Sequence, residues 1–393
     1  MIGWQTHRDN VALTGAFIGL LSALTGWLTL KPNRLSPGVS LGLAESFGWG
    51  SVSIILLLWL ACLIFSLSSK GELKAVILGI NANLILVITL FIIGLSSRML
   101  LSDAPSLSRI SLGIGFWITI LGIYTVIYAA RRRLSSQPLW SKLISWAGPL
   151  TMVIFLSTGW LSSLSLVQEL ANREARFLQE LWQHIFLFGL GISIGTLIGV
   201  IVGIWATKNR RVEKPVFYLA NITQTIPSLA LFGLLITPLS AISFAFPVLR
   251  EFGIRGIGTT PAVIALVIYS LLPIIRNTYV GLRQVDPAAI DAGIGMGMSK
   301  FTVFLRIELP LAARLIMEGI RTASVQAIGL VTVAALIGAG GLGWFVFQGL
   351  GQQAEDLILL GALPIIILAL LVDMLMRLII RVVTPRGLTV WNQ

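Results

Sequence analysis

The chain has few charged residues and little of the chemistry that builds metal sites or disulfides. Only 11% of its 393 residues are charged, whereas a soluble domain carries about 25%. The single cysteine, Cys62, cannot form an intrachain disulfide, and with only His7 and His184 beside it the chain cannot build a common zinc site. No Gly-Lys pair occurs, so no P-loop can hold ATP phosphates. Disulfide-stapled, zinc-dependent and P-loop ATPase classes are therefore excluded.

Apolar residues dominate instead. They make up 56% of the chain, and the mean hydropathy is +0.92, which predicts an integral membrane protein. A membrane-spanning helix needs about 20 mostly apolar residues, and no segment alternates with the period of a β-barrel strand. The sequence predicts an all-α, polytopic protein with about ten spans. They lie near 11–30, 49–68, 75–95, 110–130, 143–162, 184–206, 216–236, 261–281, 315–337 and 357–376.

The net charge of +12 is explained by the membrane rather than by nucleic acid. Lys and Arg collect on cytoplasmic loops of membrane proteins. If the N-terminus lies inside, most basic residues fall on inner segments, including 131–133 and 208–214. We therefore expect both termini in the cytoplasm, a multi-pass location in the cell (inner or plasma) membrane, the bilayer as a partner, and no nucleic acid.

The two halves of the chain differ in character. Residues 1–163 hold about five apolar spans with short connections and are predicted to form an N-terminal extension. Residues 164–393 hold about five spans with polar stripes and a long charged inner loop, 286–310. The stretch 164–183, which is rich in Glu and Arg, is predicted to be an amphipathic helix at the outer surface.

The inner loop Asp286–Pro310 is too polar to span the membrane and too regular for a flexible linker. Asp286 followed by Pro287 predicts a helix start. Three glycines (Gly293, Gly295 and Gly297) should break that helix or allow close backbone approach. The stretch 298–304 predicts a short amphipathic helix, and Pro310 begins the next span. Because such a helix has no lipid partner here, we expect it to dock into a groove of another protein.

The spacing of this loop resembles the EAA loop of ABC importer permeases, in which Glu-Ala-Ala, three residues, Gly, nine residues and Ile-x-Leu-Pro follow one another. Asp291 and Gly293 replace the usual Glu and the second Ala. The resemblance implies a loop that couples the permease to its ATPase. The residues assigned to it are Asp291, Ala292, Gly293, Gly297, Lys300, Phe301, Ile307, Leu309 and Pro310.

Further stretches, 221–230, 271–279 and 334–343, are similar to permeases for glycine betaine, choline and related osmoprotectants. The resemblance implies a transport subunit that is not itself an enzyme and binds no cofactor. ATP and Mg would be held by a separate ABC ATPase subunit dimer. The other implied partners are a second permease chain, identical or homologous, and an extracytoplasmic substrate-binding protein.

Two polar stripes occur on predicted core spans. The residues predicted to line a translocation path are Asn221, Gln224, Thr225, Ser228, Thr322 and Gln326. The same residue types also form hydrogen bonds between packed helices, which remains the alternative. Glu318 and Arg321 could form a gate or a paired cluster near the surface, and Asp373 should pair with Arg377.

The sequence gives less support to three other function classes: a dinucleotide-binding protein, an embedded enzyme, and a transporter of another type or cargo. Gly338, Gly340 and Gly343 fit a dinucleotide-binding spacing, but no βαβ unit surrounds them, so a tight turn or close helix packing at the outer surface is expected. No catalytic constellation or metal motif is present, which argues against an embedded enzyme. A secondary transporter, or an ABC permease for another small polar solute such as an amino acid, is the remaining alternative to the osmoprotectant importer.

Overall fold

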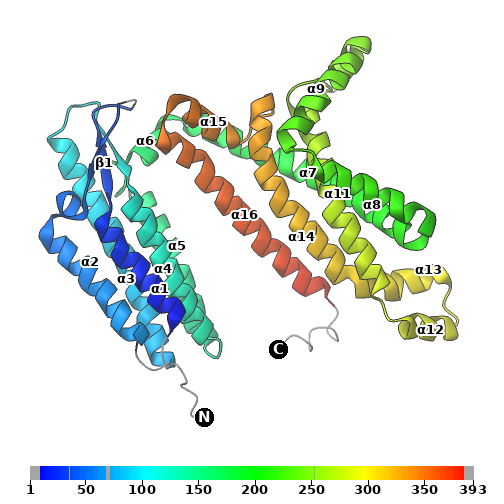
Figure 1. Ribbon diagram of the computed structural model, residues 1–393, viewed down its shortest axis with the longest axis horizontal. Helices are drawn as coiled ribbons and strands as arrows, with labels where there is room; N and C mark the ends of the chain where they lie inside the picture. The colour runs from blue at the N-terminus through cyan, green and yellow to red at the C-terminus, as the bar shows by residue number, and fades with distance from the viewer. Residues whose placement is uncertain (1–8, 35, 68–70, 252, 385–393) are drawn as a thin grey trace. The chain divides into compact units, whose positions relative to one another are not determined.

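The computed structural model describes residues 9–34, 36–67, 71–251 and 253–384 (Figure 1). The chain divides into two compact units, Met1–Asn172 and Arg173–Gln393, and Leu164 lies within the first. Among the described residues, nine helices are long and apolar enough to cross a membrane. These nine helices confirm the prediction of a polytopic helical membrane protein.

In the first unit, α1 (Asn10–Leu21) packs against α4 (Ile114–Arg133), and α2 (Leu43–Leu67), α3 (Glu72–Ser102) and α5 (Pro138–Ser157) complete a bundle. The last helix of this unit is α6 (Ser165–Asn172). Glycines let the helices approach closely: a Cβ on Gly19 would lie 2.3 Å from the Trp59 ring. The fully buried Trp59 fills the space that this glycine leaves.

The first predicted span, 11–30, is wrong in its second half. The helix ends at Leu21, a 3₁₀ turn η1 (Ser22–Leu24) follows, and strand β1 (Leu28–Lys31) begins. This strand lies between β2 (Val39–Leu41) and β3 (Arg109–Leu112) in an antiparallel sheet of order β2-β1-β3. The sheet satisfies the backbone groups that a helix would otherwise satisfy. This small sheet is the part of the described chain that departs from the predicted all-α fold.

The second unit contains the long helices α7 (Glu174–Lys208), α11 (Thr259–Arg283), α14 (Leu309–Ala334) and α16 (Glu355–Val383). The predicted outer helix 164–183 is divided: its first part is α6 and its second part belongs to α7. The predicted span 216–236 is also divided, because α8 (Arg210–Thr225) ends before Pro227 and α9 (Ser228–Ala245) begins after it. Proline disfavours helical geometry in the residue before it, which explains the break.

The contact between α7 and α11 is built on a repeat of small residues. Four glycines of α7, spaced by four, each face a side chain of α11, likewise spaced by four. The pairs are Gly191 with Leu266, Gly195 with Ser270, Gly199 with Ile274 and Gly203 with Thr278. Close backbone approach over small residues is a common basis of helix packing in membranes.

We expect Gly199→Leu to destabilise the second unit. A Cβ at position 199 would lie 2.8 Å from Ile274 Cγ2, so a larger side chain must force the helices apart. Overpacking of this kind costs about 1–3 kcal/mol. Thermal unfolding of the detergent-purified protein measures the effect. Gly189→Leu on the same helix is the matched control, since nothing lies within 4 Å of its Cβ position; equal losses in both variants would contradict the packing argument.

Candidate coupling segment and polar passage

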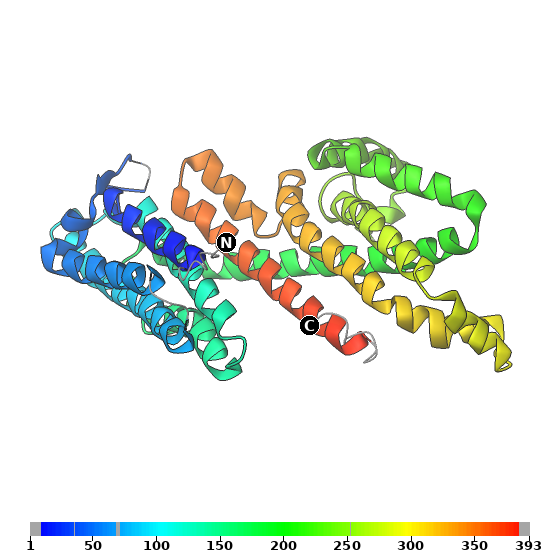
Figure 2. The same ribbon diagram turned by 60° about the horizontal axis from the view of Figure 1, so that its bottom comes forward.

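The inner loop starts as the sequence predicts. Asp286 caps α12 (Pro287–Gly295), and its Oδ1 accepts a hydrogen bond of 2.9 Å from the backbone N–H of Ala288. Pro287 occupies the first helical position, where its missing N–H costs nothing. Figures 1 and 2 both place this segment beyond the ends of α11 and α14, away from α15 (Gly343–Gln352).

The glycines of the loop have different roles. Gly293 is buried, and a Cβ there would lie 2.5 Å from Ile307 Cδ1, so it allows α12 to pack on the following segment. Gly297 adopts a φ of +82°, which reverses the chain after the helix ends at Gly295. Both predicted uses of glycine, helix termination and close approach, are confirmed at different positions.

The predicted separate amphipathic helix is instead the start of a longer helical segment. Ser299 caps α13 (Lys300–Val303), which continues through the π-helical turn η2 (Phe304–Glu308) into α14. Pro310 lies in the first turn of α14, so α14 begins where the sequence predicts, but the helical segment runs into it without a break. The apolar side chains of the predicted amphipathic helix are not all available to a partner protein, because Met298 and Phe304 are half-buried.

The exposed side of this segment carries several large apolar side chains. Met296 is 70% exposed and Phe301 71% exposed, and Ile294 and Leu305 are also exposed. Asp291, Ala292 and Lys300 are exposed beside them, whereas Ile307, Leu309 and Pro310 are half-buried. The predicted loop residues therefore divide into an exposed surface and an inner anchor.

An ion pair holds this anchor to α7. Lys208 Nζ lies 2.6 Å from Glu308 Oε2 and 5.2 Å from the centre of the Phe304 ring. The pair joins the end of α7 to the π-helical turn that leads into α14. Sequence reasoning missed both Lys208 and Glu308 as site residues. No spacing pattern links positions 100 residues apart, so only the three-dimensional fold brings them together.

The structure brings two of the predicted path residues together. Gln224 of α8 and Gln326 of α14 line a cavity of about 240 Å³, together with Tyr269 and Ser270 of α11. Gln224 Nε2 donates a 3.0 Å hydrogen bond to the backbone oxygen of Tyr269. Tyr269 in turn donates its hydroxyl to the backbone oxygen of Ile226, beside the break between α8 and α9. Tyr269 was missed because it lies in an otherwise apolar run.

The other four predicted path residues do not line this cavity. Ser228 belongs to α9, so the proposed single face of Asn221, Gln224, Thr225 and Ser228 is wrong beyond the Pro227 break. The hydroxyl groups of Thr225 and Thr322 donate to backbone oxygens of their own helices, at 2.7 Å and 2.9 Å. These hydroxyls face their own backbone rather than a shared passage.

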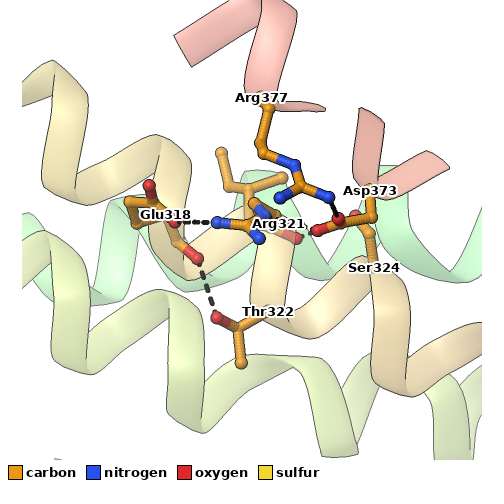
Figure 3. Close-up of polar contacts among 7 residues, drawn as sticks. Glu318, Arg321, Thr322, Ser324, Asp373 and Arg377 are labelled. Atoms are coloured by element: carbon orange, nitrogen blue, oxygen red, sulfur yellow. Dashed lines mark hydrogen bonds and ion pairs between the residues drawn. The ribbon is translucent and has the colours of Figure 1, made fainter. Parts of the chain in front are cut away.

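The predicted gate pair is part of a larger charge network. Arg321 lies 3.0 Å from Glu318 on α14 and 2.6 Å from Asp373 on α16 (Figure 3). Asp373 also pairs with Arg377, as predicted. The network therefore ties α14 to α16, a connection that the sequence did not reveal. Glu318 also lines a cavity of about 520 Å³ with Asp286 and Arg314, next to the start of the inner loop.

A glycine-rich turn closes the opposite end of α14. Gly338, Gly340 and Gly341 have positive φ angles, which confirms the tight turn expected at Gly338 and Gly340. Gly343 instead begins α15 and packs closely, because a Cβ there would lie 2.0 Å from the backbone oxygen of Thr332. Buried Glu180 of α7 accepts a 2.6 Å hydrogen bond from the Gly341 N–H, and its other oxygen pairs with Arg176 at 2.5 Å. His184, one helical turn further along α7, is fully buried.

We expect Glu180→Gln to destabilise this turn. The substitution removes the charge that pairs with Arg176 and weakens the acceptor for Gly341. Loss of a buried, charge-assisted hydrogen bond costs about 1–3 kcal/mol. Thermal unfolding tests this expectation against Glu174→Gln, an exposed glutamate on the same helix. Similar midpoints for wild type and both variants would show that the carboxylate does not hold the turn.

No group of three or more His, Cys, Asp or Glu that could hold a metal occurs in the part of the chain that the structure describes.

Two segments of the chain match known protein families. Residues 195–387 match the family described as binding-protein-dependent transport system inner membrane component. Residues 7–167 match the one described as ABC transporter permease YehY, N-terminal domain.

Individual relatives of the chain are consistent with these family matches. The carnitine transport permease protein OpuCB of Listeria monocytogenes is 40% identical over 211 residues, which cover 54% of this chain and 89% of that protein. The chain belongs to the binding-protein-dependent inner membrane transport components. The osmoprotectant import permease protein OsmW of Salmonella typhimurium is 39% identical to this permease over 207 residues, 53% of this chain and 91% of that protein.

The permease also has matches among solved structures. An inward-facing structure of the MetNI methionine ABC transporter is 20% identical, with a TM-score of 0.47, over 53% of this chain and 96% of that one. By family and by its apolar helices, the protein is a multi-pass membrane permease subunit of an ABC importer.

Proposed function

We propose that this permease imports glycine betaine or a related quaternary-amine osmoprotectant. The observation that carries the proposal is the set of relatives at 36–40% identity whose names specify carnitine, choline or osmoprotectants. The importer class does not depend on this substrate. An amino acid or another small polar solute is the competing cargo, and a secondary transporter would need no ATPase at all.

In the proposed assembly, two permease chains sit on an ABC ATPase dimer that holds ATP and Mg, and a substrate-binding protein delivers the solute from the other face. Both chain termini would lie in the cytoplasm. The exposed apolar residues of the inner loop, Met296 and Phe301 above all, would dock into the ATPase. Movement of the ATPases would then reach α14 through the helical segment that begins at Lys300.

Three features support this division of labour. The loop offers exposed apolar side chains, with Met296 before the helical segment Lys300–Ile337 and Phe301 in the first turn of that segment. The Lys208–Glu308 pair fixes the base of the loop to α7, so that a push on the loop moves more than one helix. The cavity lined by Gln224 and Gln326 lies between α8, α11 and α14, where a polar solute could pass as these helices tilt.

Transport in proteoliposomes tests the proposal. The permease is reconstituted with its ATPase and binding protein, and uptake of radiolabelled glycine betaine, choline, carnitine and histidine is measured with and without ATP. ATP-dependent uptake of a quaternary amine is expected. Uptake of histidine alone would replace the substrate and keep the importer class, and uptake that persists without the ATPase would instead identify a secondary transporter.

A further inference from the structure

The first unit contains a polar cavity that the importer function does not explain. It has a volume of about 840 Å³ and lies between the β1–β2 connection, the α3–β3 connection and α6. Its polar lining consists of two arginines, three serines and two amides. These residues are Arg34, Arg109, Ser36, Ser106, Ser108, Asn33 and Gln168. No carboxylate belongs to the described lining.

The positive charge of this cavity is only partly neutralised. Arg34 Nε lies 3.0 Å and Arg109 Nη1 lies 2.8 Å from the same oxygen, Oε1 of Glu169. The Glu169 side chain is only 4% exposed, while the two arginine side chains are 27% and 21% exposed. One buried carboxylate thus faces two guanidinium groups, which leaves a net charge of +1 in this group of three.

One further observation points to an anionic ligand. The Nη2 atom of Arg34 is buried and has no hydrogen-bond acceptor among the described residues. A buried donor without a partner destabilises the fold, and more so when it is charged, so an acceptor bound in this cavity would be favoured.

We propose that this cavity, hereafter the arginine pocket, binds a small oxyanion through Arg34 and Arg109. A guanidinium presents paired N–H donors that match the two oxygens of a carboxylate or phosphate. The serine hydroxyls and amides can bind the remaining oxygens. A free solute carboxylate, free phosphate and the phosphate of a lipid headgroup share this chemistry, so the source of the oxyanion must be separated by experiment. The pocket makes the first unit a ligand-binding domain attached to the permease.

The test uses full-length protein, first in micelles of a maltoside detergent, whose headgroup carries no phosphate, and then in lipid nanodiscs. Thermal unfolding and isothermal titration are recorded with sodium acetate, glycine betaine and sodium phosphate, each against sodium chloride at equal ionic strength. A rise in the unfolding temperature with any of the three probes identifies a free solute. A rise seen only when phosphatidylglycerol is built into the disc identifies a lipid headgroup. If no probe and no anionic lipid has an effect, the proposal is overturned.

Two substitutions are expected to change the affinity of the arginine pocket in opposite directions. Arg34→Gln should weaken binding about tenfold or more, because a charge-assisted hydrogen bond contributes about 1.5–3 kcal/mol. Arg34→Lys should retain part of the affinity. Glu169→Gln should tighten binding, because the arginines no longer share their charge with the buried carboxylate. Arg131→Gln, an exposed arginine at the other end of α4, is the matched control and should bind as wild type does.

If Arg34 has only a structural role, the unfolding temperatures and binding constants of these variants should change in a different pattern. If Arg34 only held Glu169 in place, Arg34→Gln and Glu169→Gln would both lower the unfolding temperature, and neither would change the binding constant; that result would overturn the proposal. If Glu169→Gln does not fold, equal binding by wild type and Arg34→Gln is by itself sufficient to overturn it. Transport is a separate readout, so a failed substrate assay leaves this result unaffected.

Discussion

The Phe301→Asp variant should lose its ATPase partner while remaining folded. Phe301 is 71% exposed, so its replacement removes little packing within the chain. In the assembly, the same position would place an unpaired carboxylate in an apolar groove. Truncating or polarising a residue of this kind at an interface costs about 2 kcal/mol or more, which corresponds to about a 30-fold loss of affinity. Co-purification with the ATPase, followed by ATP-dependent uptake, measures both consequences.

Leu73→Asp provides the matched control for this experiment. Leu73 is 73% exposed and lies in the first turn of α3, in the other unit of the chain. The Leu73→Asp substitution introduces the same charge at an apolar residue that is equally exposed but is not assigned to the ATPase-binding surface. Loss of the complex in Phe301→Asp alone supports the coupling role. Intact complexes and normal uptake in both variants would show that this loop does not carry the coupling contact.

The features that could be predicted from the sequence are local or repeat along one helix. The Asp286 cap, the first-turn Pro287 and the reversal at Gly297 depend on neighbouring backbone groups, so residue type and spacing were sufficient. The long spans were equally visible, because each needs only a sufficient run of apolar residues.

The features that were missed depend on partners far along the chain. Strand β1 begins where hydropathy still favours a helix, since its pairing partners Leu41 and Leu112 are remote from Leu28. The Lys208–Glu308 pair and the contact of Arg321 with Asp373 have the same cause. The Pro227 break was visible in the sequence, but the apolar run across it outweighed the proline in the prediction of one continuous span.

The charge network on α14 and α16 follows from the membrane environment. An isolated charge is costly within a bilayer, so ionisable side chains there pair with one another. Arg321 pairs with both Glu318 and Asp373, and Asp373 pairs with both Arg321 and Arg377. Two positive and two negative groups therefore balance within the cluster. Because the cluster joins two helices, any sliding of α14 along α16 must break or exchange the bond between Arg321 and Asp373.

We expect Asp373→Asn to lower the stability of the second unit by about 1–3 kcal/mol, because it leaves two arginines short of a carboxylate. Partial exposure of the group, 17% for Asp373 and 28% for Arg321, keeps the value below that of a fully buried pair. Arg321→Met should destabilise for the complementary reason. Thermal unfolding gives both values, with Arg381→Gln, an exposed arginine further along α16, as the charge control.

The double variant Arg321→Met/Asp373→Asn separates a structural pair from a gate. Residues in direct contact are not additive, so the double variant should be more stable than the sum of the single losses predicts, by about 1 kcal/mol. Additive losses would mean that the two side chains do not interact in the membrane. If the pair only joins the helices, uptake recovers together with stability. If it gates the passage, the double variant remains folded and bound to its ATPase but its uptake stays low, because the bond that must be exchanged during transport is gone.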